Sequence, residues 1–221
     1  MKIKRVAGGL LMLAMIAAAA TAFVWSEGGS VPAWYPQAER PAEPARPQLP
    51  GDAEGADALL RRLQRDGSIT MDGDDLARLA TEGLAESGDG REFLRVSRGL
   101  QGRVGDGEIE VGGVFDLSAI DESALSPDTR DGLVRLRQTV PFLVTGERYL
   151  GVRGAPHVAE GALEFADGAT LRVGDVGIPL ALIGWLGSDT DAARLHLPGL
   201  RATSVRIIGE RVTVEAEPRT P

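Results

Sequence analysis

Residues 102–119, GRVGDGEIEVGGVFDLSA, alternate between apolar and polar side chains, which is the period of a β-strand. The apolar side chains share one parity of this stretch: Ile109, Val111, Phe115 and Leu117. The charged side chains share the other parity: Glu108, Glu110 and Asp116. Antiparallel sheets with one face in water give this alternation, whereas parallel strands are apolar on both faces. The stretch therefore predicts an antiparallel sheet whose second face is wet.

Further segments continue this pattern along the chain. FLRVSRGLQGRV is expected to be a strand from Phe93 onward, with Leu94 and Val96 among its apolar positions, and the GDG at 105–107 is expected to be a hairpin turn. RYLGVRGAPHV, GALEF and ATLRVGDV follow, separated by short AEG and ADG turns. A last hairpin, TSVRIIGERVTVEAE, is expected to turn at 209–210. Together these segments predict a meander of antiparallel strands.

Three segments have helical periodicity instead. ADALLRRLQRD at 56–66 places three leucines on one face. DDLARLATEGLAE at 74–86 is a second amphipathic segment, and either Asp72 or Asp74 can cap it. A third helix is expected over 126–139, with serine as its cap, proline at its first position and its end before a second proline. A few amphipathic helices packed on an antiparallel meander make an α+β fold.

The first 26 residues contain three cations followed by an uncharged run of about 20 residues, long enough to cross a bilayer as a helix. The cations would stay on the cytoplasmic side of the membrane. Residues 20–22, Ala-Thr-Ala, also fit a cleavage site, so a cleaved signal peptide is the alternative. We expect a single-pass protein of the inner (cytoplasmic) membrane. Both interpretations place the C-terminal domain in the periplasm or extracytoplasmic space.

Residues 27–55 contain six prolines and few branched aliphatic side chains. Such a segment cannot bury enough apolar area to offset its ordering, so we expect a Pro-rich, semi-rigid linker. Trp34 and Tyr35 are expected to be ordinary linker residues, with contact to an interface or a partner as the alternative. The folded domain is then expected over 56–217, and 218–221 form a short tail.

Composition excludes several classes of function. The chain has no cysteine, so it has no disulfide framework, thiolate metal site or cysteine nucleophile. From residue 51 onward, 19 arginines stand against 29 acidic residues, a net charge of −10. Because affinity for nucleic acid depends on clustered cations, this balance disfavours a nucleic-acid partner.

The sequence contains no motif for catalysis or metal binding. His157 and His196 are the two histidines, and neither has a second imidazole or a cysteine at the spacing of a zinc site. The DGDD at 72–75 lacks the glutamate that closes a calcium loop, and helix capping explains it better. No GxSxG, P-loop or GxGxxG opening a helix is present. We therefore expect a protein that is not an enzyme and has no cofactor.

The run VGIPLALIGWLG at 176–187 contains twelve residues without a charge. One interpretation makes it a core-spanning strand or short helix. The other makes it the lip of a groove or an edge that touches a membrane, because an apolar run that carries a tryptophan suits an interface. Trp185 would then be a contact residue.

Three phrases carry a resemblance to a known family: ITMDGDDLARLATEGL, RVGDGEIEVGGVFDLS and YLGVRGAPHVAEGALEFADGATLRVGDVGIPLALI. With the Ser-Pro helix between the last two, their order over residues 56–217 resembles bacterial extracytoplasmic tubular lipid-binding (TULIP-like) domains. The resemblance implies a long, curved sheet wrapped around a helix and an apolar groove for acyl chains, on a membrane-tethered or secreted protein. It brings no catalytic motif.

We therefore expect a non-enzymatic envelope protein that binds a lipid or other amphiphile in an apolar groove, with the membrane as its partner surface. The candidate lining or lip residues are apolar side chains of the expected strands, of the third helix and of the uncharged run: Leu94, Val96, Ile109, Val111, Phe115, Leu117, Leu133, Leu136, Ile178, Leu180, Leu182 and Trp185. The alternative is a membrane-anchored scaffold with a solid core that recruits another envelope protein.

Overall fold

The computed structural model describes residues 31–35, 55–139, 141, 145–180, 194–195, 197 and 199–219. This part of the chain is an α+β fold with four α-helices and antiparallel strand pairs, as the sequence predicts. None of its helices is long and apolar enough to cross a membrane. The expected anchor at 1–26 lies outside the described residues.

The fold begins with two helices joined by a short strand. α2 (Ala56–Asp66) and β1 (Ser68–Met71) lead into α3 (Gly73–Glu86). The Asp72 carboxylate accepts a hydrogen bond from the Asp75 amide at 3.0 Å, and the Asp75 carboxylate accepts one from the Asp72 amide at 3.3 Å. This capping box confirms helix capping by Asp72.

A helix that the alternation did not predict follows α3. Gly88–Arg95 form α4, and strand β2 covers only Ser97–Gly105, so the strand expected from Phe93 is wrong in its first residues. The Ser87 hydroxyl accepts a hydrogen bond from a first-turn amide of α4 at 2.9 Å. This cap starts a helix through Leu94, and local capping outweighs the two-residue alternation there.

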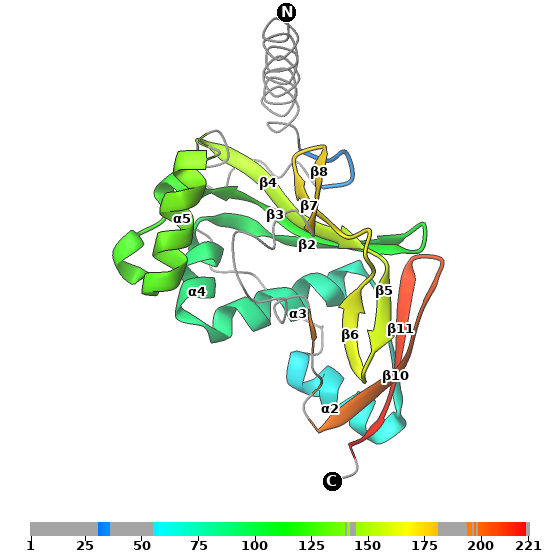
Figure 1. Cartoon of the computed structure of the whole chain (residues 1–221). Helices are drawn as coiled ribbons and strands as arrows, with labels where there is room; N and C mark the ends of the chain where they lie inside the picture. The colour runs from blue at the N-terminus through cyan, green and yellow to red at the C-terminus, as the bar shows by residue number, and fades with distance from the viewer. Residues whose placement is uncertain are drawn as a thin grey trace, which may run out of the picture.

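Five strands form the central sheet in the order β2-β3-β4-β7-β8. The strands after β2 are β3 (Glu108–Asp116), β4 (Glu147–Gly154), β7 (Thr170–Val173) and β8 (Val176–Pro179). Asp106 and Gly107, with φ of 54° and 77°, make the tight β2–β3 hairpin turn that the GDG predicts. Figure 1 shows β2, β3 and β4 side by side as the long strands of this sheet.

The connection from β3 to β4 carries short helical turns and one longer helix. Its elements are η1 (Leu117–Ala119), η2 (Glu122–Ala124) and α5 (Pro127–Thr139). The last of these confirms the predicted helix, including proline at its first position.

Two three-stranded sheets complete the fold, in the orders β1-β11-β10 and β5-β6-β9. Their remaining strands are β5 (Pro156–Ala159), β6 (Ala162–Phe165), β9 (Arg194–Leu195), β10 (Leu200–Ile208) and β11 (Arg211–Pro218). The segment RYLGVRGAPHV is thus divided between β4 and β5, in different sheets. The division falls before Pro156, which cannot donate to a strand ladder and is tolerated as the first residue of a strand.

Two apolar cores lie between these layers. The first joins α2 to the β1-β11-β10 sheet through Leu59, Leu63, Ile69, Met71, Leu200, Val212 and Val214, among others. The second lies between α4, the turns and α5 on one side and the central sheet on the other: Val96, Phe115, Leu117, Ile120, Leu125 and Leu133.

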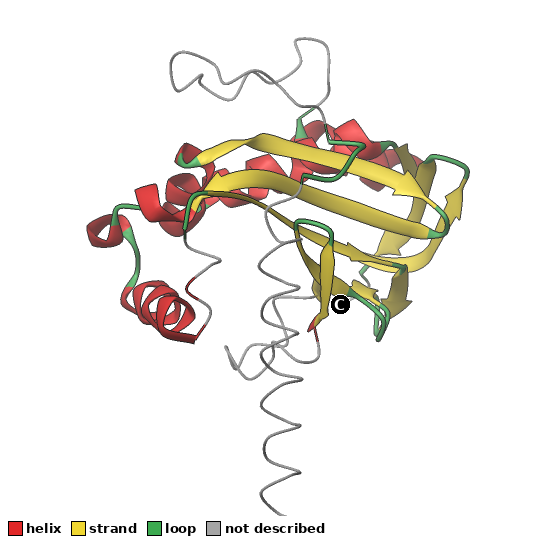
Figure 2. Ribbon diagram, turned by 90° about the horizontal axis from the view of Figure 1, so that it is seen from above, coloured by secondary structure: helices red, strands yellow, loops and turns green. Residues whose placement is uncertain are grey.

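Helices cover one face of the central sheet, which we call the helix-side face (Figure 2). Helix α3 crosses β2 so closely that a Cβ on Gly102 would lie 2.1 Å from the Gly73 carbonyl oxygen. The opposite face, which we call the outer face, was expected to be wet, and this expectation is wrong at its centre. Tyr149 is 0% exposed and Glu110 is 3% exposed. The cause is a second covering segment, Val31–Tyr35, which packs on the outer face.

Candidate functional site

A row of four aliphatic side chains runs across the helix-side face of the central sheet. Val111 pairs with Val152, Val152 with Leu171, and Leu171 with Ile178, so one side chain comes from each of β3, β4, β7 and β8. Directly paired residues in antiparallel strands point to the same face. All four are half-buried, neither closed in a core nor fully exposed. We call this set the aliphatic row.

The neighbouring row on the same face is closed by a helix. Leu150 pairs with Val173, which is 0% exposed, and Leu136 of α5 packs on Val173 together with Leu171 and Ile178. The aliphatic row therefore borders the part of the sheet that α5 covers.

The candidate groove residues fall into different environments. Four are enclosed in the second apolar core, with exposed fractions of 2–8%: Val96, Phe115, Leu117 and Leu133. Ile109 packs against the first core instead, and Leu94 lies on α4 rather than on a strand. Val111 and Ile178 belong to the aliphatic row, and Leu136 lies beside it.

The uncharged run at 176–187 is only partly within the described chain. Its first four residues form β8, and Leu180 follows with its amide donating to the Ala169 carbonyl at 2.9 Å. The run thus begins as an edge strand of the central sheet whose residues are half-buried or exposed, and this part does not span the core. Leu182 and Trp185 lie outside the described residues.

A buried carboxylate, that of Glu110, lies at the centre of a polar cluster on the outer face. Glu110 accepts a hydrogen bond from the Tyr149 hydroxyl at 3.1 Å, and its carboxylate lies 3.6 Å from a guanidinium nitrogen of Arg103 and 3.8 Å from one of Arg172. A buried carboxylate without such partners would be strongly destabilising. The cluster therefore compensates the charge that the strand alternation had placed in water.

The Tyr149 side chain lies over two paired glycines, Gly112 and Gly151. A Cβ on Gly112 would lie 2.6 Å from the Tyr149 hydroxyl oxygen, and one on Gly151 would lie 2.8 Å from it. Burial is the main cause that raises the pKa of Tyr149 far above its usual value, and the nearby Glu110 carboxylate raises it further. The ring is therefore held neutral and can donate its proton to Glu110.

Residues Val31–Tyr35, which we call the strap, cover this cluster. The Tyr35 ring is 5.6 Å from the Tyr149 ring and the Trp34 ring is 6.0 Å from it, both edge to face. The Tyr35 hydroxyl donates to the Gly99 carbonyl at 3.0 Å, and the Arg103 guanidinium lies 5.6 Å from the Trp34 ring. Tyr35 and Trp34, expected as ordinary linker residues, are therefore packing residues.

The contacts of the described strap residues set how firmly the strap is held. Burial of Tyr35 and half of Trp34 stabilises it by about 3–4 kcal/mol, the two ring pairs with Tyr149 by about 2, and one hydrogen bond by about 1. Buried Pro32, half-buried Val31 and the Arg103 guanidinium near the Trp34 ring add about 2 kcal/mol. Ordering five backbone residues costs about 5–10 kcal/mol. Gain and cost are of similar size, so the strap is held by a margin of no more than a few kcal/mol.

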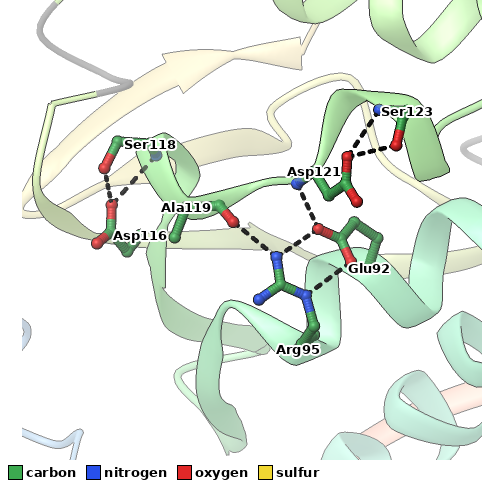
Figure 3. Close-up of polar contacts among 7 residues, drawn as sticks. All are labelled: Glu92, Arg95, Asp116, Ser118, Ala119, Asp121 and Ser123. Atoms are coloured by element: carbon green, nitrogen blue, oxygen red, sulfur yellow. Dashed lines mark hydrogen bonds and ion pairs between the residues drawn. The ribbon is translucent and has the colours of Figure 1, made fainter.

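A second polar cluster fastens the β3–α5 connection to α4 (Figure 3). The Glu92 carboxylate, on a residue only 7% exposed, accepts from Arg95 at 2.5 Å and 2.8 Å and from the Asp121 amide at 2.5 Å. Arg95 also donates to the Ala119 carbonyl at 2.6 Å. The hydrogen bonds from Arg95 hold the pKa of Glu92 below its usual value. These contacts position the two short turns over the second core.

The serines of this region are not activated nucleophiles. Ser118, Ser123 and Ser126 each donate a hydroxyl hydrogen bond to an aspartate, respectively Asp116, Asp121 and Asp89. Within the described residues no group of three histidine, aspartate or glutamate side chains is placed to hold a metal ion, and His157 is exposed on β5.

Sequence reasoning missed the residues that matter most on the outer face: Glu110, Tyr149 and Tyr35. Two signals pointed to them. The glycines Gly112 and Gly151 sit opposite each other on neighbouring strands and leave room for a ring. The aromatic pair of the strap also stands out in a segment whose other large apolar side chains are only Val31 and Leu49.

Comparison with known proteins gives no relative for this chain: no family model, no curated protein and no solved structure matches it.

Proposed function

We propose that this chain is a non-enzymatic envelope protein that binds a lipid or other amphiphile through an acyl chain laid along the aliphatic row. In this proposal residues 1–26 anchor it in the inner membrane, and the folded domain stands outside the cytoplasm in the manner of TULIP-like domains. The observation that supports binding is the aliphatic row itself: four half-buried side chains in register across four strands, on a face that is otherwise covered by helices.

The size of the row suits one alkyl chain. Four strands at a spacing of about 4.8 Å place its ends about 14 Å apart. Burying about ten methylenes gains roughly 8 kcal/mol, which corresponds to a dissociation constant near 1 μM. Binding of this kind needs no catalytic group, which agrees with the aspartate-bound serines.

A photoreactive fatty acid tests the proposal on the full chain in nanodiscs. After irradiation and digestion, labelled peptides are expected from β3, β4, β7 and β8, and excess unlabelled fatty acid should remove the label. Leu171→Asn should lower labelling about tenfold, because a polar amide in the row replaces an apolar contact. Thr170→Asn is the matched control, since Thr170 is the neighbouring residue on the outer face.

Labelling that is equal in wild type, Leu171→Asn and Thr170→Asn, or that lies outside these four strands, would refute binding at the row. A thermal melt of each variant separates lost binding from lost folding.

One observation favours the scaffold as a second candidate function. Four of the expected groove residues are closed in a packed core with exposed fractions below 9%: Val96, Phe115, Leu117 and Leu133. A solid interior of this kind suits a domain that recruits an envelope protein partner. Absence of any displaceable label in the fatty-acid experiment would favour this function.

A further inference from the structure

The strap lies on the outer face of the central sheet, and the helices and the aliphatic row lie on the other face. Its attachment is specific: Tyr35 is 6% exposed, its hydroxyl donates to Gly99 of β2, and its ring meets Tyr149 of β4. The strap therefore fixes which face of the domain the preceding chain approaches.

The position of the strap in the sequence changes the reach of the linker. From Trp25, the last residue of the uncharged run, to Val31 there are six peptide units, which span at most about 20 Å. From Trp25 to the start of α2 at Ala56 there are 31, which span about 100 Å when extended. Docking of the strap thus shortens the effective tether about fivefold.

We propose that the docked strap holds the outer face of the central sheet toward the bilayer, so that this face is the membrane-apposed surface of the domain. The proposal rests on the membrane anchor of the proposed function. A tether of about 100 Å would let the domain turn freely, whereas a tether of about 20 Å attached to one face sets its orientation.

The same geometry determines which way the aliphatic row faces relative to the membrane. Because the row lies on the face opposite the strap, an oriented domain presents the row away from the anchoring membrane. A bound acyl chain would then be offered to the space beyond the inner membrane, which suits delivery to or collection from a second carrier or membrane.

Energy transfer to the bilayer surface measures this orientation. The chain has no cysteine, so one introduced cysteine gives a single labelling site. Gly177→Cys on the outer side of β8 is suitable, since a Cβ there meets only ordinary contacts with Thr170, and Glu86→Cys marks the exposed end of α3 on the helix side. Each full-length variant carries a donor fluorophore in nanodiscs of phosphatidylcholine with acceptor-labelled headgroups.

The expected result is higher transfer from position 177 than from position 86 in the wild-type background. Adding Tyr35→Ala should remove this difference and lower both efficiencies, because the tether regains its reach of about 100 Å. Ala33→Ser is the matched control, since Ala33 is the exposed residue of the strap, and it should leave both values unchanged.

Equal transfer from the two positions in the wild-type background, or no change with Tyr35→Ala in a domain that still melts as wild type, would overturn the proposal. If Tyr35→Ala removes the difference in transfer while the row is still labelled by the fatty acid, the result supports the role of the strap and, independently, the proposed function. Failure of the full chain to remain in the nanodisc would overturn both the anchor and the orientation, while leaving the labelling of the row as an independent result.

Discussion

For Glu110, the sequence predicts the correct face of the strand but the wrong degree of exposure. Its parity places it on the outer face of β3, opposite the aliphatic side chains, as the alternation predicts. The outer face at this position is nevertheless buried, and the carboxylate is compensated by a phenol and two guanidinium groups. Because periodicity reports a face and not what covers it, burial of Glu110 could not be predicted from the strand alone.

Replacing Glu110 by alanine should destabilise the domain by about 2–4 kcal/mol, because Tyr149 loses its acceptor and the largely buried Arg172 keeps only the half-exposed Asp175 as a counter-charge. Arg103 contributes less, since its side chain is 42% exposed and water screens it. Urea unfolding at pH 7 measures the change. The control is Glu108→Ala, two residues away on the same strand, whose pair with Arg153 is about a third exposed and should cost less than about 1 kcal/mol. Equal losses from the two variants would contradict the buried cluster.

The two tyrosines predict a dependence on alkaline pH. Burial raises the pKa of Tyr149 and, to a smaller extent, that of Tyr35, whereas both should titrate near 10 when unfolded. The folded state therefore binds more protons above pH 10. Stability is complete below that pH and falls as pH rises above it, by up to about 1.4 kcal/mol per pH unit for each tyrosine.

Phenolate absorbance near 295 nm checks this directly, because the chain has only these two tyrosines. Near pH 10 the folded protein should show less phenolate than the protein in urea, because burial raises the pKa of both tyrosines. Ionisation of Tyr149 near pH 10 with the fold intact would show that the outer face is open to water.

Among the elements, α3 crosses β2 in a close contact that depends on glycine. A Cβ on Gly73 would lie 2.2 Å from the Gly102 carbonyl oxygen, so Gly73→Ala should force the helix away from the strand and cost about 1–3 kcal/mol or more. Gly83→Ala, in the same helix, meets nothing within 4 Å and should stabilise the helix by about 0.5–1 kcal/mol. Thermal unfolding of the two variants should thus shift in opposite directions, and a shift in the same direction would contradict the close crossing.

Elements with strong local signals could be predicted, and elements decided by long-range packing could not. The Asp72 cap, the GDG hairpin and the Pro127 helix start follow from local chemistry, and the structure confirms them. Helix α4 was missed because its cap, Ser87, stands in a stretch of glycines that also fits a turn. The segment RYLGVRGAPHV is divided because β4 and β5 join different sheets. Its alternation is the same on both sides of the division, so the sequence pattern does not show where it falls.

The candidate site could be predicted only in part for a related reason. Alternation identified the face of β3 that carries Val111, and this residue belongs to the aliphatic row. It could not separate Val111 from Phe115 and Leu117, which have the same parity but are buried in the second core. Leu117, expected on the strand, in fact begins η1. Exposure along one face of a strand depends on where the covering helices end, which is a property of the assembled domain.

At the scale of the whole molecule, the central sheet is covered unequally on its two faces. Helices and an extensive core hold the helix-side face, whereas five residues of strap hold the centre of the outer face. The contacts of the strap nearly balance its ordering cost. Residues 36–54 connect it to the domain, so its docking is intramolecular and does not weaken on dilution.

Cutting that connection should therefore release the domain. A specific protease site inserted between 36 and 54 leaves the strap and the domain unchanged until cleavage, and the uncut protein in nanodiscs is the control. After cleavage and dilution to micromolar concentration, the domain from α2 onward should leave the nanodisc, because binding of the strap in trans is too weak at that concentration. Sedimentation of the nanodiscs measures the retained fraction. A domain that stays bound after cleavage would show that the strap holds far more strongly than its few contacts indicate, and that its docking is a permanent part of the fold.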